Sequence, residues 1–105
     1  MITSFIPGRI RFRSPIFQDS DIYSAVFPII KNLREITSFS YNQKTGSLLV
    51  QYDPEKIPVE KLKPLMPLAE RMKPILLFYS DRDKPAVLKA VGEVRNFLEQ
   101  QSLLK

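Results

Sequence analysis

The chain has 105 residues, of which 44% are hydrophobic and 26% are charged, and its formal net charge is +5. This length and balance are typical of one small globular domain, and they exclude a fibrous or disordered chain. The sequence contains no cysteine and no histidine. Disulfides, thiolate or imidazole metal ligands, and thiol or imidazole catalysts are therefore excluded. The positive charge favours acidic partners, such as phosphates or acidic protein surfaces.

The first predicted element is a strand over residues 2–13, bent at Pro7-Gly8 because proline cannot donate to a ladder. Its second half reads "RIRFR", with an arginine at every second residue. Alternate side chains of a strand share a face, so the arginines lie together, opposite the apolar residues between them. These residues are Arg9, Arg11 and Arg13.

Residues 18–36 predict a helix that Asp19 or Ser20 caps, since apolar residues recur there at helical spacing. Two alternating runs follow within residues 36–54, and they are joined at Gly46, which predicts a β-hairpin. Leu49 points away from the core in this hairpin. The inward set across the strands is Ile10, Phe12, Phe39, Tyr41, Leu48, Val50 and Tyr52.

Residues 54–72 predict short helical turns that bend at Pro64, because proline interrupts a regular helix. Residues 73–79, "KPILLFY", are apolar on both faces and predict a buried strand. Residues 84–103 predict an amphipathic helix with Asp83 as its cap. Its apolar stripe consists of Val87, Ala90, Val91, Val94, Phe97 and Leu98.

The order strand, helix, strand, strand, helix, strand predicts an α+β fold, namely a ferredoxin-like βαββαβ sandwich with an additional C-terminal helix. Residues 1–80 form the ferredoxin-like domain, and residues 81–105 form the C-terminal helix, packed on that domain or on a partner. In this arrangement the core helices cover one face of the sheet, and the arginines line the other. We expect Leu49, Leu76 and Phe78 to form an apolar patch on that second face, covered by the C-terminal helix or by a partner.

The phrases "PGRIRFRSP" and "TGSLLVQYDP" resemble the heavy-metal-associated (HMA) domain, and more closely its cysteine-less relatives of the HMA domain 2 type. The resemblance extends over about residues 1–79. It implies a metal site of two cysteines in metal-carrying members, between the first strand and the first helix. The matching loop here, "RSPIFQDSD", has no cysteine, so no metal ligand carries over. The resemblance further implies a setting beside P-type metal-ion ATPases or proteins of metal-storing compartments.

No residue pattern points to catalysis, a metal or a cofactor. Asp19 and Asp21 precede a helix, where capping explains them better than cation binding. Asp81 and Asp83 in "SDRDKP" are typical of a turn and a helix cap rather than of an acid and base pair, and no glycine-rich phosphate loop is present. We therefore expect a protein without enzymatic activity.

The three arginines have two interpretations. They form a solvated face, paired with carboxylates such as Glu93 or Glu99 of the last helix, or they form a recognition surface whose planar forks bind carboxylates or phosphates. Among partners, a protein is favoured. RNA is the alternative, disfavoured because the outward positions of the hairpin carry Leu49 and Gln51 instead of stacking aromatics.

The predicted function is a non-enzymatic protein-interaction or regulatory module associated with metal-ion transport or storage machinery. Its partner is a membrane metal-transport ATPase, a storage-compartment protein or a second copy of the chain. We expect a cytoplasmic location, free or held at a membrane through the partner, because no apolar run approaches the roughly 20 residues that span a bilayer. The predicted partner-binding residues are Arg9, Arg11, Arg13, Leu49, Phe78, Val87, Val91, Val94 and Leu98.

Overall fold

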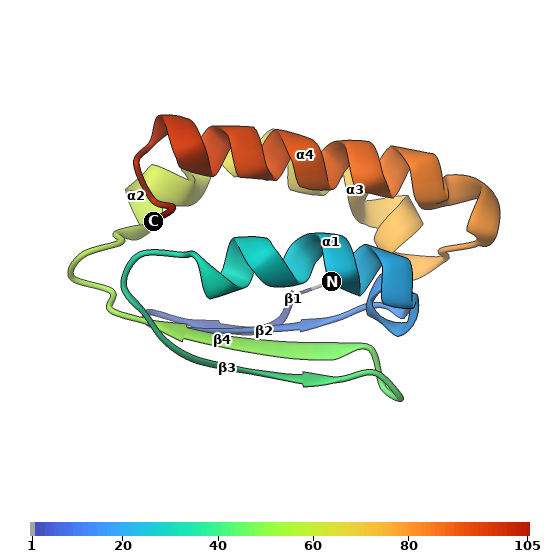
Figure 1. The fold of residues 1–105 in the computed structure, drawn as a ribbon, viewed down its shortest axis with the longest axis horizontal. Coiled ribbons are helices and arrows are strands. Elements are labelled where there is room, and N and C mark those ends of the chain that lie inside the picture. The colour runs from blue at the N-terminus through green and yellow to red at the C-terminus, as the bar shows by residue number, and fades with distance from the viewer. Residues whose placement is uncertain (1) are drawn as a thin grey trace.

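The computed structural model describes residues 2–105, which form one four-stranded antiparallel sheet with the order β1-β2-β4-β3 and helices on one side of it (Figure 1). The strands are β1 (Ile2–Ile6), β2 (Arg9–Arg13), β3 (Ile36–Asn42) and β4 (Ser47–Tyr52). The helices are α1 (Ser20–Lys31), α2 (Val59–Leu62), α3 (Met66–Leu77) and α4 (Lys84–Gln100). Short 3-10 turns are η1 (Pro15–Gln18), η2 (Lys63–Leu65) and η3 (Asp81–Asp83). The sheet's second face is left uncovered by the helices.

The N-terminal segment forms two strands instead of the single bent strand that was predicted. Pro7 and Gly8 form the turn, Gly8 has a φ of +88°, and β1 folds back antiparallel on β2. Glycine suits this turn because it adopts positive φ without a steric cost. β2 also pairs with β4, which in turn pairs with β3, so β4 separates β2 and β3. The helix α1 connects those two strands, which makes a split β-α-β unit.

The predicted hairpin is confirmed as β3 and β4, joined through Gly46 with a φ of +66°. The inner sheet face packs against α1, where Ile22 is fully buried and Leu48 is 3% exposed. The predicted inward set is confirmed as well. Each member belongs to one of the two core clusters or packs against it: Ile10, Phe12, Phe39, Tyr41, Leu48, Val50 and Tyr52.

Residues 73–79 are not a strand, so the predicted βαββαβ order is wrong at its last element. The helical turns bend at Pro64 as predicted, but α3 then continues through Pro74 to Leu77. The reason is the spacing of the residues that pack against the core, which recur at helical intervals. These residues are Leu68, Met72, Ile75, Leu76 and Tyr79.

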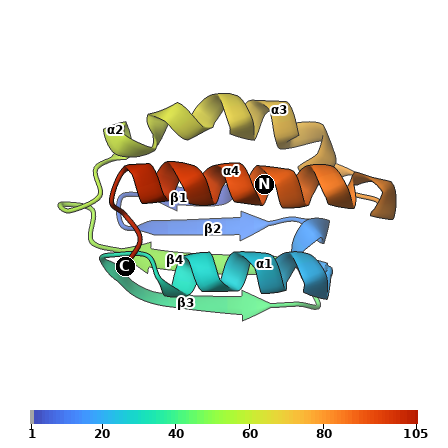
Figure 2. The same ribbon diagram turned by 45° about the horizontal axis from the view of Figure 1, so that its top comes forward.

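One of the arrangements expected from the sequence places α4 over the second face of the sheet. The structure contradicts that arrangement, because α4 does not cover this face. It lies on the same side as α1 and α3 and contacts both (Figure 2). Its ends are held to the rest of the chain. Lys84 pairs with Asp21 (Nζ–Oδ2 2.6 Å), and beyond the helix the Leu103 carbonyl accepts a hydrogen bond from the Arg34 N–H (2.7 Å). None of the helices within residues 2–105 has both the length and the apolar character that crossing a bilayer demands.

Candidate functional site

The outer face of the sheet carries the three arginines, and all three side chains are exposed as predicted. The register places Arg9 opposite Gln51, Arg11 opposite Leu49 and Arg13 opposite Ser47. Neighbouring positions on β3 continue these rows with small polar side chains. We call this surface the arginine face. It consists of Arg9, Arg11, Arg13, Ser38, Ser40, Asn42, Ser47, Leu49 and Gln51.

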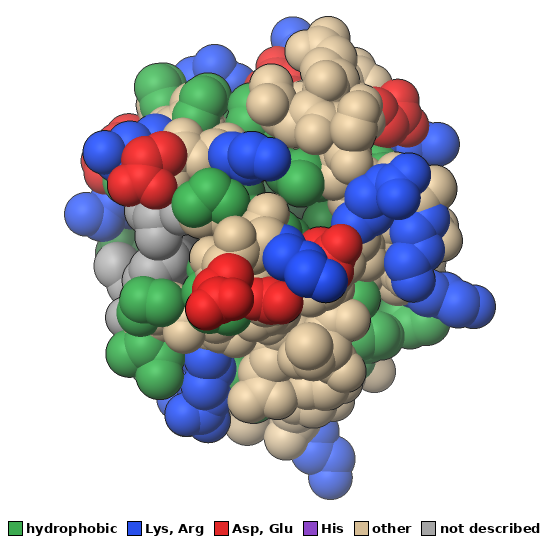
Figure 3. Space-filling view, turned by 90° about the vertical axis from the view of Figure 1, so that its left-hand side faces the viewer, with side chains coloured by type: hydrophobic (Ala, Val, Ile, Leu, Met, Phe, Trp, Pro, Cys, Tyr) green, Lys and Arg blue, Asp and Glu red, His purple; other side chains and the backbone are tan. Residues whose placement is uncertain are grey.

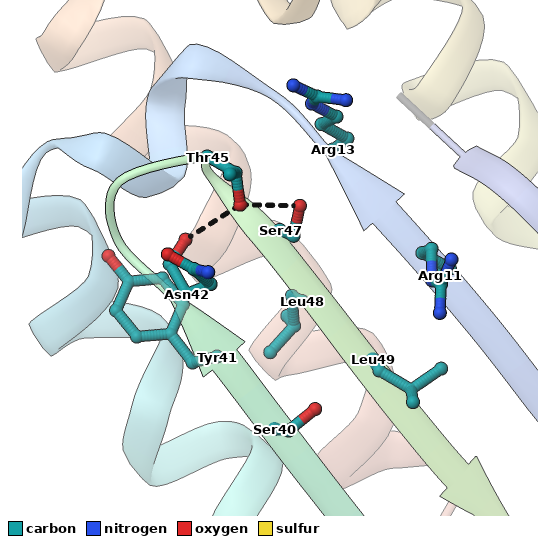
Figure 4. A pocket seen from close by; sticks show the side chains of 9 residues that line it. All are labelled: Arg11, Arg13, Ser40, Tyr41, Asn42, Thr45, Ser47, Leu48 and Leu49. Carbon is teal, nitrogen blue, oxygen red and sulfur yellow. Dashed lines mark hydrogen bonds between the residues drawn. The ribbon is translucent and has the colours of Figure 1, made fainter.

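A shallow depression of about 600 Å³ lies at one end of the arginine face (Figure 4). Arg11 and Arg13 extend from β2 along one side of it, and Leu49 contributes an apolar floor between the strands. At the hairpin end, the Thr45 hydroxyl donates to Ser47 Oγ (2.8 Å) and fixes the rim. The depression therefore combines guanidinium groups, hydroxyl groups and one aliphatic side chain.

All the charged side chains of the arginine face are positive. No strand of the sheet contains an aspartate or a glutamate. The carboxylates considered as partners pair elsewhere, because Glu93 binds Arg71 (2.8 Å) and Glu99 binds Arg95 (3.2 Å), and α4 lies on the other side of the sheet. Figure 3 shows a different end of the molecule, where acidic and basic side chains alternate.

Apart from Leu49, the predicted apolar contact residues do not join this surface. Phe78 is 81% exposed, but it follows the end of α3 and so lies outside the sheet. Leu76 packs against the core. The apolar stripe of α4 packs against the rest of the chain, since Val87 is 2% exposed and Leu98 is 6% exposed. Buried side chains such as these offer no area to a partner. Val91 and Val94 are partly buried against the same core clusters.

Asp19 is a helix cap, as predicted, and it also belongs to a cluster that sequence reasoning missed. Its Oδ1 accepts from the backbone N–H of Asp21 (2.9 Å) and of Ile22 (3.4 Å). Its Oδ2 accepts from the Tyr79 hydroxyl (3.0 Å) and lies 3.3 Å from Lys84 Nζ. Lys84 also donates to Asp21, and 63 positions separate these two residues in the sequence. No local sequence pattern therefore indicates that their side chains are in contact.

These contacts shift three pKa values. Burial alone raises the pKa of Asp19, but hydrogen bonds from Tyr79, Lys84 and two backbone N–H groups outweigh it and bring that pKa below 3.8. The hydrogen bond to Asp21 raises the pKa of Lys84 to about 12. Burial, together with the hydrogen bond to Asp19, raises the pKa of Tyr79. The cluster thus holds the charged Asp19 carboxylate against the Lys84 ammonium group at neutral pH.

The loop between β2 and α1, where the resemblance noted from the sequence would have implied a metal site, is packed into the core. Ile16 and Phe17 of η1 are buried, and the Ser14 hydroxyl donates to the Leu76 carbonyl (2.7 Å). Among residues 2–105 there is no group of three or more acidic residues placed to hold a metal ion. The residues of this loop therefore act as structural anchors.

The sequence predicted only part of the surface that the structure assembles. It placed the three arginines and Leu49 together, and the register confirms that placement. It did not single out the polar rim, although the period-two alternation of the hairpin contains that signal. The rim residues are Ser40, Asn42, Thr45 and Ser47.

The fold and this surface define a small mixed α/β protein with an antiparallel sheet, one face of which is cationic and uncovered by helices. The family model described as heavy metal associated domain 2 matches residues 1–97. The chain therefore belongs to the heavy metal associated domain 2 family, and it is a member without cysteine. Comparisons with curated proteins and with solved structures give no significant match.

Proposed function

We propose that the chain is a non-enzymatic interaction module whose arginine face binds an acidic, extended segment of a partner protein in metal-transport or metal-storage machinery. Family membership supports the metal-related setting. One observation carries the choice of surface: β2 presents three exposed arginines in a row on a sheet whose strands contain no carboxylate. A partner ATPase or storage-compartment protein would hold the chain at its place of action, in the cytoplasm or against a membrane.

The spacing of the arginines favours an extended ligand. Alternate residues of a strand are about 6.8 Å apart, and the carboxylates of an extended peptide with an acidic residue at every second position have the same spacing. A guanidinium can donate two parallel N–H hydrogen bonds to one carboxylate, and this bidentate geometry adds directional selectivity that a lysine ammonium lacks. Leu49 lies opposite Arg11, in the middle row, and can contact an aliphatic side chain of such a peptide.

The expected affinity is modest. Exposed ion pairs contribute about 0.2–1 kcal/mol each, and one apolar contact adds about 1–2 kcal/mol. The sum is about 2–5 kcal/mol, which corresponds to a dissociation constant of roughly 0.2 mM or weaker. The binding weakens with salt because the face is exposed. A partner anchored in a larger assembly compensates for such an affinity by raising the local concentration.

RNA is the second candidate because the same arginines attract phosphates. The aromatic side chains of the hairpin, Phe39, Tyr41 and Tyr52, belong to the inner set that packs against the core. Phe78 lies beyond the sheet. Without outward aromatics, this face lacks the stacking platform on which single-stranded RNA recognition depends. Protein carboxylates are therefore the better match.

The architecture is, in our interpretation, a variant of the ferredoxin-like arrangement. The unit β2–α1–β3, with β4 between the two strands, corresponds to the first half of that arrangement. The edge beside β2, where the last strand of a ferredoxin-like sheet lies, is here taken by β1. This substitution frees residues 66–77 to form α3.

Fluorescence anisotropy with a labelled peptide that alternates glutamate and threonine tests the proposal. The native chain should bind this peptide, and changing Arg9, Arg11 and Arg13 to glutamate should weaken binding at least tenfold. A control triple, in which Lys61, Lys73 and Lys89 become glutamate, makes the same change in net charge on exposed helical positions. It should leave the affinity within about twofold, because these lysines lie away from the arginine face.

Two results would contradict the proposal. Equal losses in both triple variants would mean that only the overall charge attracts the peptide. Tighter, arginine-dependent binding of a single-stranded oligouridylate, in the presence of competing peptide, would assign the face to RNA. Replacing the three arginines with lysine refines the test, because it keeps the charge and removes the bidentate fork.

A further inference from the structure

The strand β3 forms one open edge of the sheet. It pairs with β4 on one side only, and it lies at the border of the sheet in Figure 2. Within residues 2–105, no backbone hydrogen bond joins β3 to any element other than β4. Every second residue of β3 therefore directs its N–H and C=O groups outward, where another strand can pair with them.

From Ser38 onward, this edge lacks the features that normally prevent pairing. Residues 36–43, "ITSFSYNQ", contain no charge, no proline and no glycine. Natural edge strands are usually protected by lysine, proline or a bulge along their length. The only irregularity in β3 lies between Ile36 and Ser38, which leaves Ser38–Asn42 in regular register. The regular stretch is centred on Ser40.

Four aromatic rings line the inner side of the same edge, and we call them the aromatic flank. Tyr23 of α1 stacks on Tyr41 of β3 with ring centroids 3.6 Å apart. Phe27 of α1 meets Phe39 of β3 edge to face at 5.7 Å. All four residues are only partly buried. Partly exposed aromatic clusters of this kind are enriched at protein interfaces.

The charges at the two ends of the strand indicate what the edge fits. Glu35, which also pairs with Lys56 (3.4 Å), directly precedes the uncharged run and Lys44 follows it, and both are exposed. An antiparallel copy of the same strand brings the Glu35 end of one chain beside the Lys44 end of the other, so opposite charges meet twice. The run is therefore complementary to itself in the antiparallel direction and not in the parallel one.

We infer that a second copy of this chain pairs with the first along β3, antiparallel, around a two-fold axis at Ser40. Opposite residues of an antiparallel pair point to the same face, so the helices of both copies lie on one side. Phe39 of each copy then lies opposite Tyr41 of the other, which joins the two aromatic flanks. The two arginine faces become continuous on the other side of one extended sheet.

Analytical ultracentrifugation of the native chain and of Ser40 variants tests this inference. The native chain should be a dimer that dissociates on dilution. Ser40→Lys and Ser40→Glu each place like charges at the axis and should weaken the dimer at least about tenfold. An equimolar mixture of these two variants should form a heterodimer. The control Ser24→Lys, at an exposed position of α1, should dimerise like the native chain.

The end charges provide a second test that does not depend on Ser40. Glu35→Lys and Lys44→Glu should each weaken the dimer, whereas the double variant should restore it because the opposite charges again meet. A native chain that is monomeric at all concentrations would overturn the inference. So would a dimer that persists in both Ser40 variants. The chain with Arg9, Arg11 and Arg13 changed to glutamate should still dimerise, which separates this inference from the proposed function.

Discussion

Truncating Val87 measures how firmly α4 packs on its own chain. Val87 is 2% exposed within the core cluster that contains Ile22 and Leu48. Alanine there removes two buried methyl groups, worth about 1.6 kcal/mol of transfer free energy. An incompletely relaxed cavity adds up to about 1 kcal/mol, and the better helix propensity of alanine returns about 0.5 kcal/mol. We expect the free energy of unfolding to fall by about 2 kcal/mol.

Guanidinium unfolding followed by circular dichroism measures this change, and thermal unfolding should show a lower midpoint by roughly 8 °C or more. Leu88→Ala is the matched control, because Leu88 is the next residue of the same helix and is 39% exposed. It should cost less than half as much. If Leu88→Ala destabilised the chain as strongly as Val87→Ala, the packing of α4 described here would be refuted.

Three further predictions concern positions where the backbone or a charge is constrained. Gly46→Ala should destabilise the chain by at least about 2 kcal/mol in guanidinium unfolding, because Gly46 has a φ of +66° and an added Cβ would lie 2.2 Å from the Ser14 carbonyl oxygen; a neutral effect would contradict that turn geometry. Gly92→Ala should instead raise the free energy of unfolding by about 0.5–1 kcal/mol, and with it the thermal midpoint, because Gly92 lies inside α4 with nothing within 4 Å of the new Cβ. A lower midpoint would be inconsistent with that open space. The pKa of Asp19 is lowered in the folded state, so its stabilisation is present above pH 3.8 and is lost as the pH falls through the folded pKa. Urea unfolding should accordingly show a shallower acid dependence in Asp19→Asn than in the native chain, and unchanged slopes would speak against the contacts of Asp19.

Local patterns in the sequence predicted the hairpin and the placement of the arginines well. Arg9, Arg11 and Arg13 alternate with apolar residues, and a period of two fixes which face each side chain takes whatever the rest of the chain does. The hairpin at Gly46 was predictable for the same reason, since its turn and its alternation lie within one short segment.

Other features depend on contacts between distant segments. Residues 73–79 are a short apolar run, which suits a buried strand or a buried helix equally until the packing partners are known. The destination of α4 was not predictable either, because an apolar stripe shows that a helix is covered but not by what. The pairing of Lys84 with Asp21 joins the starts of α4 and α1, so it follows from the fold and from no motif.

Nuclear magnetic resonance during titration with the alternating glutamate and threonine peptide tests the central claim most directly. The largest shift changes should occur at backbone amides of β2 and of β4, in residues 9–13 and 47–51. The amides of α1 and α4, on the opposite side of the sheet, should change little. Changes concentrated on the helices, or none at peptide concentrations that saturate binding in anisotropy, would contradict the assignment of the arginine face as the partner-binding surface.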